Sequence, residues 1–148
     1  MKLYLDTSAL VKYFHNETGT DAMIQLLNDS DNIVYASELV RIEFLSALMR
    51  RYREHELDEF VLQKAIIGFN ETMDAYHIEP MSSIVLKEAE NLMKRFGKTH
   101  ALKTLDSFHL STFSLIAEEG WYFVAADRKL CHLVHEMGFN SLNPLMQE

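Results

Sequence analysis

The chain contains one cysteine, Cys131, and therefore cannot form an internal disulfide. It has only two prolines and five glycines among 148 residues, and neither a flexible linker nor an internal repeat divides the sequence. With 48% hydrophobic residues, a chain of this length can bury a core of its own. We therefore expect a single domain over residues 1–148.

Long apolar runs are also missing, and none approaches the roughly 18 residues that a membrane-spanning helix requires. The N-terminal residues lack the basic start and apolar segment of a secretory signal peptide. These absences predict a cytoplasmic protein with no membrane partner.

Basic residues are outnumbered, with 14 lysines and arginines against 22 acidic residues and a net charge of −8. This charge excludes a protein that coats nucleic acid through bulk electrostatic attraction. It does not exclude an enzyme that acts on nucleic acid. A local basic patch can still contact phosphates, and a metal site made of carboxylates itself adds negative charge.

Strands and helices are expected to alternate along the chain. A buried strand at 2–5 precedes Asp6, and the Thr7–Ser8 pair can cap a helix that ends at Phe14. The clearest strand is the segment WYFVAA, which Asp127 follows directly. Further strands are expected at 33–36, 76–81 (an edge strand) and 139–142. Further helices are expected at 22–27, from a cap at Ser37 to about 53, at 58–73 and 83–96, from Thr104 to just before Gly120, and at 128–137. This order predicts an α/β protein with a parallel sheet covered on both faces.

Two acids, Asp6 and Asp127, each follow a predicted strand. Ligands of open parallel sheets bind outside the carboxyl ends of the strands, so both carboxylates are expected at one edge of the sheet. Taken singly, each acid is equally well explained as a helix N-cap. Two acids that point to one crevice weaken that explanation.

Two further acids, Glu43 and Asp106, lie on predicted helices. Glu43 is on a partly apolar face and needs a partner, because burying an unpaired carboxylate is costly. A surface ion pair with Arg41 or Arg50 is the simplest such partner. Asp106 lies in the first turn of its helix, where the helix dipole alone would favour an acid.

Together, these four acids could form one carboxylate pocket. Like charges about 4 Å apart repel by roughly 4 kcal/mol at an effective dielectric constant near 20, so the pocket would require cations or raised pKa values. Hard oxygen ligands favour Mg²⁺ or Mn²⁺ over zinc. One or two such ions can activate water and hold a phosphodiester for in-line attack.

The segments YLDTSALVKYF, SELVRIEFLSAL, LDSFHL and FVAADRKL occur in this order and are followed by GFNSLNP. They resemble the PIN domain, specifically the small ribonuclease toxins of VapBC-type toxin–antitoxin pairs. The resemblance extends from about residue 2 to residue 144. Each motif alone is weak, whereas the ordered set in a chain of this length is fairly specific.

The resemblance implies an α/β/α sandwich and an endoribonuclease that depends on Mg²⁺ or Mn²⁺. It assigns metal binding and catalysis to Asp6, Glu43, Asp106 and Asp127, with the Ser8 hydroxyl, next to that of Thr7, supporting the metal site. It also implies a homodimer, a small cognate antitoxin and a structured RNA substrate such as transfer or ribosomal RNA.

One position departs from the family pattern: many members carry Thr or Ser two residues before the last acid, where this chain has Ala125. The loss of that hydroxyl makes Asp127 the least secure of the four acids. It also leaves open a non-catalytic PIN-like scaffold that binds metal and docks a protein or RNA partner.

The remaining histidines and cations give weaker signals. Cys131, His132 and His135 are close in sequence, but no second Cys or His pair has matching spacing, which favours a solvated helix face over a zinc site. His109 can orient Asp106 or act as a general base, although a packed, hydrogen-bonded structural histidine is the simpler interpretation. Beside the last acid, Arg128 and Lys129 are placed to contact RNA phosphates.

Overall fold

The computed structural model describes residues 1–146, and within them a five-stranded parallel sheet forms the centre of the molecule. The strand order is β3-β2-β1-β4-β5, which confirms the expected α/β class and the edge position of β3. The strands are β1 (Lys2–Leu5), β2 (Ile33–Ser37), β3 (His77–Glu79), β4 (Tyr122–Val124) and β5 (Asn140–Leu142).

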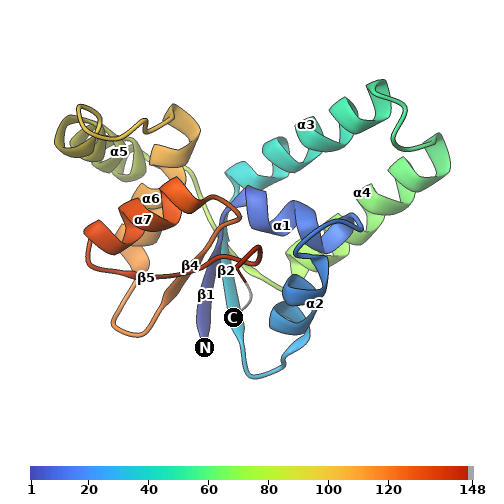
Figure 1. The fold of residues 1–148 in the computed structure, drawn as a ribbon, viewed down its shortest axis with the longest axis horizontal. Helices are drawn as coiled ribbons and strands as arrows, with labels where there is room; N and C mark the ends of the chain where they lie inside the picture. The colour runs from blue at the N-terminus through green and yellow to red at the C-terminus, as the bar shows by residue number, and fades with distance from the viewer. Residues whose placement is uncertain (147–148) are drawn as a thin grey trace.

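The helices cover both faces of this sheet and form the three layers of an α/β/α sandwich (Figure 1). One side carries the first four helices and the other side the last three. They are α1 (Thr7–Phe14), α2 (Thr20–Asn28), α3 (Leu39–Arg53), α4 (Glu59–Asp74), α5 (Ser83–Phe96), α6 (Thr104–Ile116) and α7 (Arg128–Glu136). No helix in the described part of the chain is long and apolar enough to cross a membrane.

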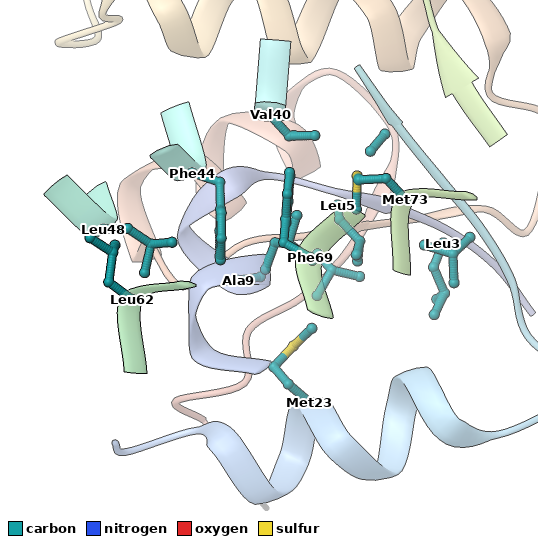
Figure 2. Close-up of a cluster of buried hydrophobic side chains, with 14 residues drawn as sticks. Leu3, Leu5, Ala9, Met23, Val40, Phe44, Leu48, Leu62, Phe69 and Met73 are labelled. Carbon is teal, nitrogen blue, oxygen red and sulfur yellow. The ribbon is translucent and has the colours of Figure 1, made fainter. Parts of the chain in front are cut away.

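The sheet separates two hydrophobic cores because successive side chains of a strand point to opposite faces. Leu3 and Leu5 of β1 belong to the core beneath α1–α4. Figure 2 shows this core, in which Phe44 of α3 and Phe69 of α4 stack with ring centroids 4.0 Å apart. Tyr4, between the two leucines, lies in the other core.

The second core packs α5, α6 and α7 against the opposite face. Tyr4 stacks on Phe123 of β4, with ring centroids 5.5 Å apart, and Phe113 of α6 contacts both rings. Aromatic rings of this size supply much of the apolar area that a small domain can bury. The alternation of Leu3, Tyr4 and Leu5 along β1 therefore determines which side chains enter each core.

Two local predictions are corrected. Thr7 and Ser8 are not the cap of the first helix but lie inside α1, and Asp6 is its N-cap, accepting a hydrogen bond from the Ser8 N–H at 3.0 Å. Aspartate caps as well as serine does, and here it directly follows the strand. The WYFVAA strand is shorter than expected, because regular pairing ends at Val124 and the chain then turns toward α7.

Candidate active site

The carboxyl ends of β1 and β4 lie side by side at the point where the strand order reverses. In open α/β sheets this topological switch point is where ligands bind. Asp6 leaves β1 there, and its N–H still donates to the carbonyl of Val124 at 2.9 Å. Asp127 lies three residues after the end of β4. Because β1 and β4 are neighbours in the sheet, Asp6 and Asp127 lie at the same edge, as predicted.

Asp6 is buried, with 4% of its surface exposed, and is held by Ser8. Its Oδ2 accepts hydrogen bonds from both the N–H and the hydroxyl of Ser8. The same hydroxyl oxygen accepts a hydrogen bond from the Ala126 N–H at 3.0 Å. Ser8 thus joins the end of β1 to the segment that leads into Asp127.

Asp127 is the N-cap of α7, and its Oδ1 accepts a hydrogen bond from the Leu130 N–H at 3.0 Å. Ala125 is fully buried in the second core, where its carbonyl accepts a hydrogen bond from the Cys131 thiol. Both strand-end acids therefore cap helices, as the simpler explanation held. Capping uses one oxygen of Asp127 and does not prevent the carboxylate from facing a pocket.

Asp106 lies in the first turn of α6 and is half-buried. Burial raises the pKa of this carboxyl to about 6, and the negative charges of Asp6 and Asp127 add to the effect, against smaller opposing effects of Lys103 and His109. The charges of Asp6 and Asp127 are therefore felt at Asp106, although the oxygens of the three carboxylates do not all lie within 4.8 Å of one another. The structure places three of the four predicted acids around one end of the sheet without direct contact between them.

Glu43 joins the site through hydrogen bonds to other side chains. Its Oε1 accepts a hydrogen bond from the Thr7 hydroxyl at 3.0 Å and lies 2.5 Å from Nε2 of His109. The His109 Nδ1 is 3.2 Å from the Tyr4 hydroxyl, and its Nε2 is 4.0 Å from Asp6 Oδ1. A hydrogen-bonded chain thus leads from the second core, through His109, to the helix α3.

This pairing decides the protonation of both partners. Burial by itself would raise the pKa of Glu43 and lower that of His109, which is fully buried. Their mutual hydrogen bond and charge attraction reverse both tendencies, so the pKa of Glu43 lies below its ordinary value and that of His109 above it. The pair is therefore best described as an imidazolium and a carboxylate.

Two interpretations of single residues are wrong. Glu43 has a partner, but it is His109 and not Arg41 or Arg50. His109 is a packed, hydrogen-bonded histidine as expected, yet the side chain that it orients is Glu43 and not Asp106. No local pattern could indicate this contact, because 66 positions separate the two residues.

A pocket of about 620 Å³ opens beside the acids. Asp106 and Asp127 line it, together with the cations Lys103, Arg128 and Lys129. Two of these cations were expected beside the last acid, whereas Lys103 was missed. A pocket lined by both acids and cations suits a ligand that carries both a cation and phosphate groups.

The Cys131, His132 and His135 side chains do not converge. Cys131 is buried against Ala125, His135 contacts the Ser141 hydroxyl at 2.9 Å, and His132 points to Glu136. The three do not form a zinc site, in agreement with the interpretation from their spacing.

Comparison with known proteins supports the fold and the family. A family model described as the PIN domain matches residues 3–135. No curated protein sequence matches the chain significantly.

Similar solved structures include VapC20 of Mycobacterium tuberculosis, described as a sarcin–ricin loop cleaving toxin, with a TM-score of 0.70 and 15% identity over 96% of this chain and 99% of that one. FitAcB of Neisseria gonorrhoeae has a TM-score of 0.69 and 14% identity, over 98% of this chain and 99% of that one. VapBC2 of Rickettsia felis, bound to a promoter DNA fragment, has a TM-score of 0.65 and 15% identity, over 97% of this chain and 98% of that one. At these identities the likeness concerns the fold, and the match of the family model shows that the chain belongs to the PIN domain family.

Proposed function

We propose that this protein is an endoribonuclease that depends on Mg²⁺ or Mn²⁺ and is the toxin of a type II toxin–antitoxin pair. One observation carries the proposal: in a PIN domain, Asp6 and Asp127 follow neighbouring strands at the switch point of the sheet, and their negative charges add to burial in raising the pKa of Asp106. Such a cluster of carboxylates is stable at neutral pH when a cation neutralises it.

The donor set fits a hard divalent cation. Asp6, Asp106 and Asp127 offer carboxylate oxygens, which Mg²⁺ and Mn²⁺ prefer, and Glu43 would act in the network that surrounds them. When bound, the ion would supply charge neutralisation at the phosphodiester and acidify a water molecule.

The protein's own side chains would position the substrate and the acids. Lys103, Arg128 and Lys129 line the pocket and would hold RNA phosphates. Ser8 would fix the Asp6 carboxylate relative to Asp127 through its two hydrogen bonds. His109 would hold the Glu43 carboxylate in place beside the site through their mutual hydrogen bond.

The proposed partners follow from the family and from the similar structures. The neighbour from Mycobacterium tuberculosis is described as cleaving the sarcin–ricin loop, and other neighbours are toxin–antitoxin complexes. We propose a structured RNA, such as transfer or ribosomal RNA, as substrate, a small cognate antitoxin as inhibitor, and a homodimer of single PIN domains acting in the cytoplasm.

A non-catalytic scaffold is the second candidate, and Ala125 favours it. At that position the chain lacks the hydroxyl that many family members carry before the last acid. In this case the carboxylates would bind a cation, and the pocket would hold a partner without turning it over.

Cleavage of a pool of structured RNAs by the purified protein, with Mg²⁺ or Mn²⁺, separates the two candidates. A nuclease loses activity on chelation, and Asp6→Asn lowers the rate by about 100-fold or more. Asp74→Asn, which changes an exposed acid at the end of α4, is the matched control and leaves the rate unchanged. Metal binding without cleavage of any RNA would contradict the nuclease and favour the scaffold.

A further inference from the structure

A second group of metal-binding side chains lies outside the carboxylate site. His100, in the segment between α5 and α6, meets His132 and Glu136, which lie four residues apart on one face of α7. The His100 Nε2 is 2.8 Å from one oxygen of Glu136, and the His132 Nε2 is 3.1 Å from the other. One carboxylate thus lies between two imidazole nitrogens.

The Thr99 hydroxyl lies beside the His100 ring. It is 3.3 Å from the Phe96 carbonyl and 2.9 Å from the His100 Nδ1. This contact at Nδ1 leaves the Nε2 of His100 facing Glu136. With an ion on Nε2, Nδ1 would carry the proton and donate to the Thr99 oxygen, whose own proton would go to the Phe96 carbonyl.

An ion bound at Nε2 would take the place of the direct contact between His100 and Glu136. A hydrogen bond from Nδ1 to a neighbouring oxygen is the usual support of a metal-binding histidine, because it fixes the tautomer and the ring orientation. The ring of His100 is also held edge-on against Phe96, at a centroid distance of 5.8 Å.

The spacing of the three groups is close to that of a coordination site. Their ligand atoms all lie within 4.8 Å of one another. In a tetrahedral zinc site with bonds of about 2.0–2.1 Å, the ligand atoms are about 3.4 Å apart. The His132 side chain is 69% exposed, so it can make the small movement that closes the site.

We propose that His100, His132 and Glu136 bind a divalent transition-metal ion such as Zn²⁺ and thereby tie the 97–103 segment to α7. Two imidazoles and one carboxylate, with a position left for water, form a ligand set that zinc uses and Mg²⁺ does not favour. The donors differ in kind from the carboxylates of Asp6, Asp106 and Asp127. The molecule therefore carries two cation sites of different chemical preference.

The second site borders the pocket of the carboxylates. His100 and His132 line the same pocket as Asp106 and Asp127, so a bound ion adds positive charge to the wall that already carries Lys103 and Arg128. Because His100 lies just before α6, the ion also fixes the segment that leads into the helix of Asp106. The binding itself does not depend on the nuclease proposal.

Calorimetric titration of the tag-free full chain with Zn²⁺, in excess Mg²⁺ at neutral pH, tests the proposal. The excess Mg²⁺ occupies the carboxylate site, and Asp6→Asn provides a second way of removing that site from the measurement. We expect one equivalent of Zn²⁺ to bind in both proteins. Proton–nitrogen correlation spectra should show His100 protonated at Nδ1 and shifted at Nε2 on addition of Zn²⁺.

Substitutions of the exposed ligands locate the ion. His132→Ala and Glu136→Gln should each weaken Zn²⁺ binding by about tenfold or more, and Thr99→Val, which removes only the supporting hydroxyl, by about tenfold. His55→Asn, which removes an exposed histidine elsewhere, is the matched control and should bind as wild type does. Circular dichroism confirms that each variant is folded.

Two results would overturn the proposal. If the wild-type chain binds no Zn²⁺ in excess Mg²⁺, the three side chains form only a hydrogen-bonded cluster. If His132→Ala and Glu136→Gln both bind Zn²⁺ as tightly as wild type, the ion lies elsewhere.

Discussion

Glu43 and Asp106 are two half-buried carboxyls on helices near the same edge of the sheet, and their pKa values move in opposite directions. Desolvation acts on both in the same sense. Glu43 faces the imidazole of His109, whereas Asp106 faces the charges of two other acids. The comparison shows that the partner, and not the depth of burial, decides which carboxyl is already neutralised and which still needs a cation.

Removing the partner of Glu43 should have the largest effect. His109→Ala leaves a cavity in a fully buried position and a half-buried carboxylate without its cation, and we expect a loss of about 3 kcal/mol in the free energy of unfolding. Urea denaturation measures it. His55→Asn is the control and changes little, and a loss below about 1 kcal/mol would show that the pair contributes less than its burial implies.

Neutralising Glu43 itself tests the pair without a cavity. Glu43→Gln should reduce stability by about 2 kcal/mol, because it replaces a charge-assisted hydrogen bond by a neutral one. The lowered pKa of Glu43 gives stability above about pH 4.5, lost as the pH falls through its folded pKa. The raised pKa of His109 gives stability below about pH 6.5, lost as the pH rises through its folded pKa.

The difference between wild type and Glu43→Gln should therefore be greatest between these two pH values and smaller on either side. Denaturation curves recorded as a function of pH measure this difference. A difference that grows steadily up to alkaline pH would contradict an imidazolium–carboxylate pair.

The corresponding substitution, Asp106→Asn, should raise the free energy of unfolding at neutral pH, whereas Glu43→Gln lowers it. A raised folded pKa means that wild-type stability falls as the pH rises from about 3.8 to about 6 and then levels off. Without metal at neutral pH, Asp106→Asn should therefore gain about 1 kcal/mol, after allowance for solvent screening of a half-exposed group.

The gain should vanish below about pH 4, where both proteins carry a neutral side chain. Thermal unfolding with chelator, and then with Mg²⁺, measures both effects, since Mg²⁺ should stabilise wild type more than the variant. A variant that is less stable than wild type in chelator would remove the evidence for a repulsive cluster.

The smallest effect is expected at the far end of the hydrogen-bonded chain. Tyr4→Phe removes the hydroxyl that contacts His109 but keeps the ring against Phe113 and Phe123, so the loss should be less than about 1 kcal/mol. Histidine titration by NMR gives a second reading. If the pKa of His109 is unchanged, the Tyr4 hydroxyl does not contribute to the charge of the ring, which the neighbouring acids then determine.

The fold could be predicted because each of its parts has a local signal. Alternating strand and helix patterns dictate a parallel sheet with helices on both faces. The positions of Asp6 and Asp127 followed from the rule for strand ends, although the identity of the cap at Asp6 did not, since Asp, Thr and Ser all cap helices well.

The polar contacts of the site could not be predicted, because they join residues far apart in sequence. Tyr4 and His109 are separated by 105 positions, and their contact depends on how α6 crosses the end of β1. The same holds for His100, which approaches α7 only because the segment after α5 passes beside it. Spacing within one helix shows which residues share a face, but not what that face meets.

The order in which the candidate catalytic acids occur along the chain has a consequence for synthesis. Asp6 is made first and Asp127 last, and at about 5–20 residues per second a ribosome needs on the order of ten seconds to pass from one to the other. Until β4 and the turn into α7 have emerged, the switch point has only one of its two strands. A chain that ends before residue 127 therefore carries no complete set of acids, and under the proposed function it would not cleave the RNA around it.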